Sequence, residues 1–192
     1  MIKYLFFVAG AITMLVMSAH YLSPEPSGIL IGKPIAKTAW YPFVFKMHIS
    51  SGLVAMTIGT IQILPNVLRK WHRQLGYIYV IAVGTSSLAA LTIAPFSMGG
   101  WINTVGFSCL AILWGTSTYL GIRYAIKKDL KQHRRWMWIS YALTFSTIPQ
   151  RTMLVLALIT NIPFISIYQL SAWLPWLLNL IIVHYILPFK TA

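Results

Sequence analysis

The sequence has very few acidic residues and almost no cysteine. Its 192 residues include only two carboxylates, Glu25 and Asp129, and one cysteine, Cys109. A single thiol excludes a disulfide framework and a thiolate metal cluster. Two acids outside the apolar segments cannot complete a Ser-His-acid triad, and a catalytic zinc would depend on histidines alone. We therefore expect no hydrolase and no proton pump built on a relay of carboxylates.

Charged residues of either sign are scarce, whereas apolar residues are abundant. Only 9% of the residues are charged, 58% are hydrophobic, and the mean hydropathy is +0.72. A soluble domain would have about a quarter charged residues. We predict an all-α polytopic membrane protein with one transmembrane domain, in which spans two to five form a core bundle flanked by spans one and six. The expected spans are 4–22, 43–65, 77–95, 101–124, 135–160 and 164–187.

The formal charge of +13 at pH 7 would suggest nucleic-acid binding in a soluble protein. Its distribution along this chain favours another partner. In a six-span layout most cations fall on one side of the membrane, whereas Lys33, Lys37 and Lys46 fall on the other, as the positive-inside rule describes. We therefore expect cytoplasmic termini, contact between the basic loops and anionic lipid head groups, and no nucleic-acid partner.

The expected fifth span has a polar line along one side. For a helix turning about 100° per residue, six positions lie within about 40° of one direction. They are His133, Met137, Ser140, Thr144, Thr147 and Arg151. At about 1.5 Å per residue, Arg151 lies roughly 27 Å beyond His133, almost across the ~30 Å hydrocarbon layer. A cation at that depth normally faces the bundle interior, so the line predicts an inward-facing polar site.

A proline lies in the same span. Pro149 should bend or break the helix and release a backbone carbonyl inside the membrane, which then needs another donor. Arg151 could be that donor, which would make its role structural. The alternative is that Arg151 attracts an anion or a polar head group, because no acid lies within a span.

The expected second span has another candidate face. His48, Gly52, Gly59 and Gln62 lie within about 40° of one direction, with the imidazole near the outer end and the amide near the inner end. The glycines remove side-chain bulk and would admit a neighbouring helix or a flat ligand. Two interpretations stay open: a ligand site, or the small-residue packing that is common between membrane helices.

Two histidine–arginine pairs begin helices that run outward. His72 precedes Arg73, and His133 precedes Arg134 and Arg135. Free backbone N–H groups and the positive end of the helix dipole favour an anion at such positions. A lipid phosphate would explain both pairs without a special function, and a cofactor site is the alternative.

An ordered set of motifs resembles a known family. It comprises HISSG at 48–52, Gln62, WHRQLGYIY at 71–79, Gly99–Gly100, Trp114, Asp129 before QHRRWM at 132–137, and Arg151. Over about residues 40–155 this set resembles the bacterial multi-pass membrane proteins of domain-of-unknown-function family 2306 (DUF2306, YozB-like). The resemblance implies the bacterial cytoplasmic (inner) membrane and no settled activity. The helical core is also similar, more weakly, to two-haem b-type cytochromes.

The first functional hypothesis is a membrane oxidoreductase or electron carrier that binds haem b or reacts with quinone. A bis-histidine haem needs two imidazoles at one depth, small residues beside the ring and cations near its propionates. On the outer side His48 would pair with His20, beside Gly52 and near Lys46 or Arg151. The inner candidates are His72, His133 and His184, surrounded by Arg73, Arg134 and Arg135. Candidate metal ligands are thus His48, His72 and His133, although the fourth span contains no histidine.

Two other functions stay open. A binding or transport module for a quinone, a lipid or a small anion would use a cavity lined by His48, Gln62, Ser140, Thr144, Thr147 and Arg151. An accessory subunit of a larger membrane complex would agree with the eight tryptophans and the few polar groups.

Overall fold

The regular structure of the protein is helical. The computed structural model describes residues 2–23, 30, 31, 33–64 and 69–186, and every regular element within these ranges is a helix. This confirms the predicted all-α class. The chain divides into two compact units, Met1–Phe96 and Ser97–Ala192.

The helices are long and apolar enough to cross a membrane. Five segments meet this description, namely Trp40–Ile63, His72–Phe96, Gly100–Ile126, Leu130–Ile159 and Phe164–Tyr185. A further apolar helix, Tyr4–Ala19, is shorter. These helices occur in the order of the six predicted spans and overlap each of them. The membrane crossings themselves stay a prediction. The first helix ends before the predicted residue 22 because the chain tightens into a 3-10 turn at His20–Leu22.

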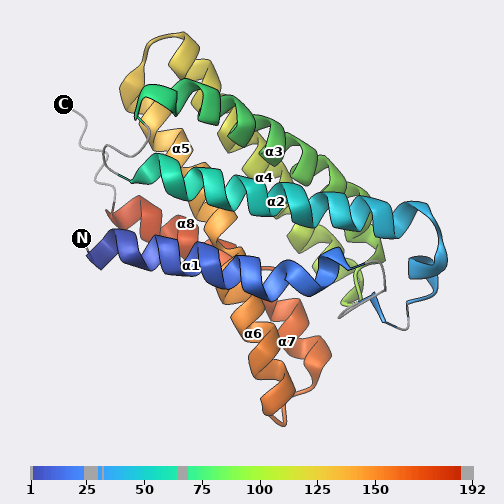
Figure 1. Ribbon diagram of the computed structural model, residues 1–192. Helices are drawn as coiled ribbons and strands as arrows, with labels where there is room; N and C mark the ends of the chain where they lie inside the picture. Colours follow the sequence, from blue (N-terminus) through green and yellow to red (C-terminus); the bar gives the residue numbers. More distant parts are fainter. Residues whose placement is uncertain (1, 24–29, 32, 65–68, 187–192) are drawn as a thin grey trace. The chain divides into compact units, whose positions relative to one another are not determined.

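The first unit is built on a helical hairpin. Its elements are α1 (Ile2–Ala19), η1 (His20–Leu22), η3 (Pro34–Lys37), α2 (Trp40–Ile63), η4 (Arg69–Trp71), α3 (His72–Ile93) and η5 (Ala94–Phe96). Helices α2 and α3 lie side by side along their length, and α1 packs against α2 (Figure 1). The two hairpin helices bury small side chains such as Ala55, Gly59, Ser86 and Ala89. Small residues let the backbones approach closely, which matters in lipid because it offers no hydrophobic driving force between helices.

The segment before α2 packs on the far end of α3. Lys33 Nζ donates a hydrogen bond to the Phe96 carbonyl oxygen over 3.0 Å, and the rings of Trp40 and Tyr41 contact the Phe96 ring edge-on. Leu30, three residues before Lys33, is buried. The carbonyl offsets part of the desolvation of the half-buried lysine, whose pKa burial lowers from its usual value. The last part of the long predicted outer loop is therefore attached to the hairpin.

The second unit contains two hairpins. Its helices are α4 (Gly100–Ile126), α5 (Leu130–Phe145), α6 (Thr147–Ile159), α7 (Phe164–Ser171) and α8 (Leu174–Ile186). Helix α4 packs along α5, α6 runs beside α7, and α5 also contacts α8 (Figure 1). Asn179 on α8 donates to the Ala142 carbonyl oxygen on α5 over 3.0 Å, which ties the last helix to the α4–α5 hairpin.

Two of the spans are broken, each four residues before a proline. Proline has no N–H and its ring crowds the carbonyl four residues earlier. Helix α5 ends at Phe145, four residues before Pro149, and α7 ends at Ser171, four residues before Pro175. The break at Pro149 confirms the sequence prediction. The second break was not predicted, and the sixth span is therefore two helices rather than one.

The break between α7 and α8 packs closely on α4. Trp173 Nε1 donates to the Ile102 carbonyl oxygen over 3.1 Å, and Asn103 Nδ2 donates to the Tyr168 carbonyl oxygen over 3.0 Å. Gly106 makes this approach possible, because a Cβ atom there would lie 2.8 Å from Trp173 Nε1 and 2.9 Å from the Ala172 carbonyl oxygen. The polar groups released at the break are thus partly satisfied by the neighbouring helix, as the apolar surroundings require.

We predict that Gly106→Ala destabilises the protein and that Gly84→Ala does not. The alanine at position 106 meets backbone and indole atoms and should cost about 1–3 kcal/mol of unfolding free energy, as overpacking does. Gly84 also lies in a membrane helix, but a Cβ there has no atom within 4 Å outside its own helix. The measurement is thermal unfolding of both variants in mild detergent. Equal melting temperatures would contradict the close approach at Gly106.

Candidate functional site

His48 joins the two helices of the first unit. Its Nδ1 atom lies 3.0 Å from the Ser86 carbonyl oxygen and 2.9 Å from Ser86 Oγ on α3. The Ser86 hydroxyl in turn donates to the His48 carbonyl oxygen over 2.9 Å. The imidazole is half-buried. One histidine and one serine therefore form a reciprocal polar link across the α2–α3 interface.

This geometry assigns the tautomer of His48. A carbonyl oxygen can only accept, so the Nδ1 atom that approaches the Ser86 carbonyl must carry the proton. In the neutral imidazole the lone pair is then on Nε2. A nitrogen of that kind can coordinate a metal or accept a proton from a hydroxyl group. Metal-ligating histidines commonly donate their second N–H to a backbone carbonyl in this way.

The predicted face of α2 turns toward α3. A Cβ atom on Gly52 would lie 3.4 Å from Ser86 Oγ, and one on Gly76 would lie 3.9 Å from Gln62 Nε2. Gly52 therefore admits the neighbouring helix, which favours the small-residue packing interpretation. Gln62 Nε2 is buried and has no hydrogen-bond partner among the described residues. Fourteen residues separate His48 from Gln62, about 21 Å along a helix, so the two mark opposite ends of the hairpin.

The polar line of the fifth span is the interface between α4 and α5. Trp114 Nε1 donates to Thr144 Oγ1 over 2.9 Å, and Thr118 Oγ1 lies 2.6 Å from Ser140 Oγ. Ser140 is 0% exposed and Thr144 is 3% exposed. The line does face inward, as predicted. Its two central hydroxyls are hydrogen-bonded to side chains of α4, and the cavity of the binding-module hypothesis stays a prediction.

His133 repeats the arrangement of His48 in the second unit. Its Nδ1 atom lies 2.7 Å from the Gly121 carbonyl oxygen on α4, which again requires the proton on Nδ1. Met137 lies against Gly121, where a Cβ would come within 2.5 Å of the sulfur atom. Both histidines are thus held on a backbone carbonyl of the neighbouring helix, and both have a glycine in the adjoining interface.

The C-terminal end of the polar line belongs to a separate helix. The break at Ser146 places Thr147 and Arg151 on α6, so the line does not continue along one straight helix as the sequence suggested. Thr147 Oγ1 donates to the Thr144 carbonyl oxygen over 3.0 Å. Arg151 is half-buried. Its assignment to an anion or to a released carbonyl stays a prediction.

The histidine–arginine pairs lie at helix starts, as expected. His72 and Arg73 are exposed in the first turn of α3, and Arg73 Nε donates to the Tyr77 hydroxyl over 3.3 Å. Arg134 is also exposed. At the start of α5, the Asp129 carboxylate accepts the Gln132 N–H over 3.0 Å. An internal acid therefore satisfies one of the N–H groups that we had assigned to an external anion.

The candidate ligands of the first unit lie at two depths. His48 lies at the level of Ser86 on α3, which it contacts. His72 lies 14 residues before Ser86 on the same helix, about 21 Å away along α3. His20 directly follows α1, and the neighbouring Tyr21 ring packs edge-on against Phe45 at 5.6 Å. The side chain of His20 lies outside the described part. Among the described residues, no group of three or more His, Cys, Asp and Glu side chains could hold a metal ion.

Sequence reasoning missed three residues of these interfaces. They are Ser86, Thr118 and the fully buried Asn103. The hairpin register could have predicted Ser86 and Thr118. In two antiparallel helices, residues that are equally distant from a tight connection face each other. Thr118 and Ser140 lie about equally far from the turn near Lys128, as do Trp114 and Thr144. Asn103 had no such signal, because its partner, the Tyr168 carbonyl oxygen, lies in the last turn of α7 before the break that was not predicted.

The fold and the polar interfaces define a helical membrane protein with several spans. A family model described as "predicted membrane protein (DUF2306)" matches residues 45–187, and the chain belongs to this family. The match extends beyond the residues on which the sequence resemblance rested and includes the sixth span. No curated protein and no solved structure matches the chain.

We predict energetic coupling between Thr118 and Ser140. The double-mutant cycle of Thr118→Val and Ser140→Ala should give about 0.6 kcal/mol and at most ~1.7 kcal/mol, the range for hydrogen bonds between membrane helices. The matched control pairs Thr118→Val with Thr152→Val, because Thr152 bonds only within α6 and should be additive. Unfolding in mixed micelles measures both cycles. Coupling no larger than the control would contradict the assigned bond.

Proposed function

We propose that the protein binds b-type haem within the membrane and carries electrons, with His48 as an axial ligand. The observation that supports this is the hydrogen bond from His48 Nδ1 to the Ser86 carbonyl oxygen. It holds the ring in one orientation, keeps the lone pair on Nε2 and raises the basicity of that nitrogen. When bound, a haem supplies one-electron chemistry.

The tautomer favours iron over an oxidised quinone. A quinone carbonyl needs a donor, and the N–H of neutral His48 is already used on α3. Iron needs a lone pair, which is what Nε2 provides. A hydroquinone hydroxyl could also donate to that atom, so the quinone-reactive alternative is restricted to the reduced form. The binding-module alternative has less support, because Ser140 and Thr144 are engaged on α4.

The second outer ligand that we propose is His20. It begins η1, which packs on α2, and the contact of Tyr21 with Phe45 puts this segment within one turn of His48. We therefore propose that His20 and His48, from different elements of the first unit, form the outer ligand pair.

His133 is the proposed ligand of an inner centre. Its Nδ1 bond to the Gly121 carbonyl gives it the same tautomer as His48. His72 and His184, the inner partners proposed from the sequence, are exposed near helix ends. The basic residues around His133, notably Arg134, would neutralise propionate groups.

We predict that the protein purified in mild detergent after expression with added haem precursor shows a Soret band and sharp α and β bands on reduction with dithionite. His48→Ala should remove the outer centre, because the lone pair on Nε2 is lost. Ser86→Ala is the matched control, since it weakens the same interface and leaves both the imidazole and the backbone carbonyl in place.

Three results would contradict the proposal. A colourless, folded preparation after reconstitution with excess haem would remove the haem altogether. A reduced spectrum of His48→Ala identical to that of the unaltered protein would remove His48 as ligand. Equal losses of haem absorbance in His48→Ala and Ser86→Ala would indicate that the histidine acts only in helix packing.

A further inference from the structure

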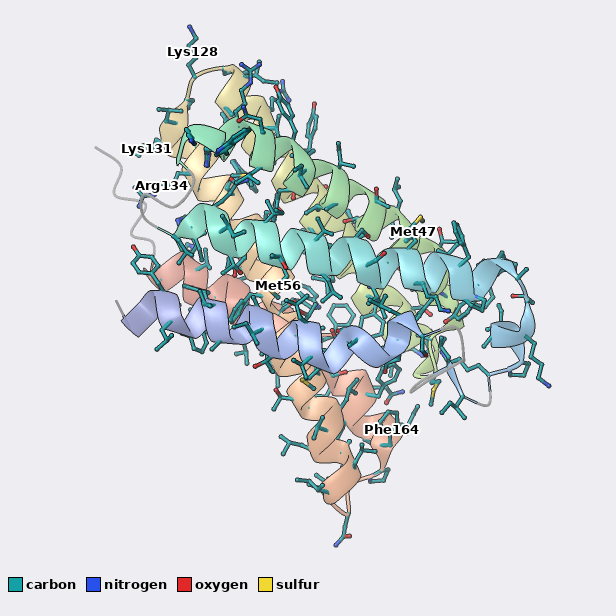
Figure 2. All side chains as sticks on the ribbon, in the orientation of Figure 1. Met47, Met56, Lys128, Lys131, Arg134 and Phe164 are labelled. Carbon is teal, nitrogen blue, oxygen red and sulfur yellow. The ribbon has the colours of Figure 1, made fainter. Side chains whose placement is uncertain are left out.

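The turn between α4 and α5 concentrates positive charge. We define the basic turn as residues 123–135, which contain six cations: Arg123, Lys127, Lys128, Lys131, Arg134 and Arg135. All but Arg135 are exposed, and Figure 2 shows Lys128, Lys131 and Arg134 projecting from this end of the hairpin. The one acid in the turn, Asp129, caps α5 through the Gln132 N–H. Its carboxylate is therefore directed to the backbone, and the turn keeps a large positive charge.

Two large aliphatic side chains lie among these cations. Ile126 is 77% exposed and Leu130 is 69% exposed, one on each side of the turn. Exposed aliphatic groups flanked by lysines are typical of segments that lie at the membrane interface, where the aliphatic part enters the boundary of head groups and acyl chains. The same pattern would be unfavourable in a turn that projects into bulk water.

The turn has a defined and strained backbone. Lys128 has φ +61°, and the Asp129 N–H donates to the Tyr124 carbonyl oxygen over 3.0 Å, as in a Schellman motif. Glycine is the residue that adopts this conformation without steric cost. A lysine at a position suited to glycine points to a requirement for its side chain.

The length of α4 gives the depth of the turn. Its 27 residues extend about 40 Å, beyond the ~30 Å hydrocarbon layer. The last turns of α4 therefore reach the level of the lipid phosphates when the rest of the helix crosses the membrane.

We propose that the basic turn is a docking surface for anionic phospholipid, with Lys127, Lys128 and Lys131 on the phosphates and with Ile126 and Leu130 inserted at the head-group boundary. The occupant is a lipid rather than a nucleic acid because of the aliphatic pair and because both ends of the turn continue into membrane helices. Each cation near an anionic surface should contribute about fivefold to the affinity.

The test uses the full-length protein in a neutral detergent. Phosphatidylglycerol is titrated against phosphatidylcholine, and binding is measured by native mass spectrometry and thermal shift. Replacing Lys127, Lys128 and Lys131 by Gln should weaken phosphatidylglycerol binding on the order of 100-fold without changing phosphatidylcholine binding. The matched control replaces the same lysines by Arg, which keeps the charge and should retain most of the affinity.

Two further variants separate docking from folding. Lys128→Gly relieves the left-handed strain, so it should raise Tm in detergent alone and still lower phosphatidylglycerol affinity about fivefold. Ile126→Ser with Leu130→Ser should weaken binding to phosphatidylglycerol but leave its salt dependence unchanged.

Several outcomes would overturn the proposal. These are an unchanged affinity in the Gln variant, an equal loss in the Arg variant, and equal stabilisation by inorganic phosphate at the same concentration, which would indicate a small-anion site. Tight binding of RNA that is lost in the Gln variant would likewise indicate a nucleic-acid surface instead of a lipid surface.

Discussion

An imidazole that donates to a backbone carbonyl of the next helix holds each of the two main hairpins. Lipid is as apolar as the side chains it surrounds, so membrane helices associate through close packing and hydrogen bonds rather than through the hydrophobic effect. His48 meets Ser86 where Gly52 admits the neighbouring helix, and His133 meets Gly121 in the same way. The placement of the other polar groups in these interfaces depends on the helix separation that these contacts allow.

The prolines determine where the remaining spans change direction. A helix in lipid can break only where another element satisfies the released backbone groups. At the α7–α8 break this element is α4, through Asn103 and through the space left by Gly106. The break at Pro149 was predictable from sequence because proline lacks the N–H that an unbroken helix needs. Pro175 carries the same local signal, but it lies among aromatic residues, and the partner that makes its break tolerable is about 70 residues distant in sequence.

The sequence predicted the fold class and the inward faces but not the partners of those faces. Periodicity is a property of one helix, and it correctly placed Ser140 and Thr144 on the buried side of the fifth span. Which groups they contact depends on the register between two helices. The periodicity of a single helix gives no information about that register. The hydroxyls therefore looked like the lining of a cavity, whereas Thr118 and Trp114 use them as hydrogen-bond partners. The same limit applies to Gly52. A glycine that makes room for a ligand and a glycine that makes room for a neighbouring helix look identical in the sequence.

The two nitrogens of each anchored imidazole have separate roles in this arrangement. Nδ1 belongs to the helix interface, and its N–H persists in both the neutral and the protonated ring. The hairpin bonds of His48 and His133 are made by Nδ1, and the neutral tautomer that they select has its lone pair on Nε2. The contact with the neighbouring helix therefore determines the chemical character of the second ring nitrogen.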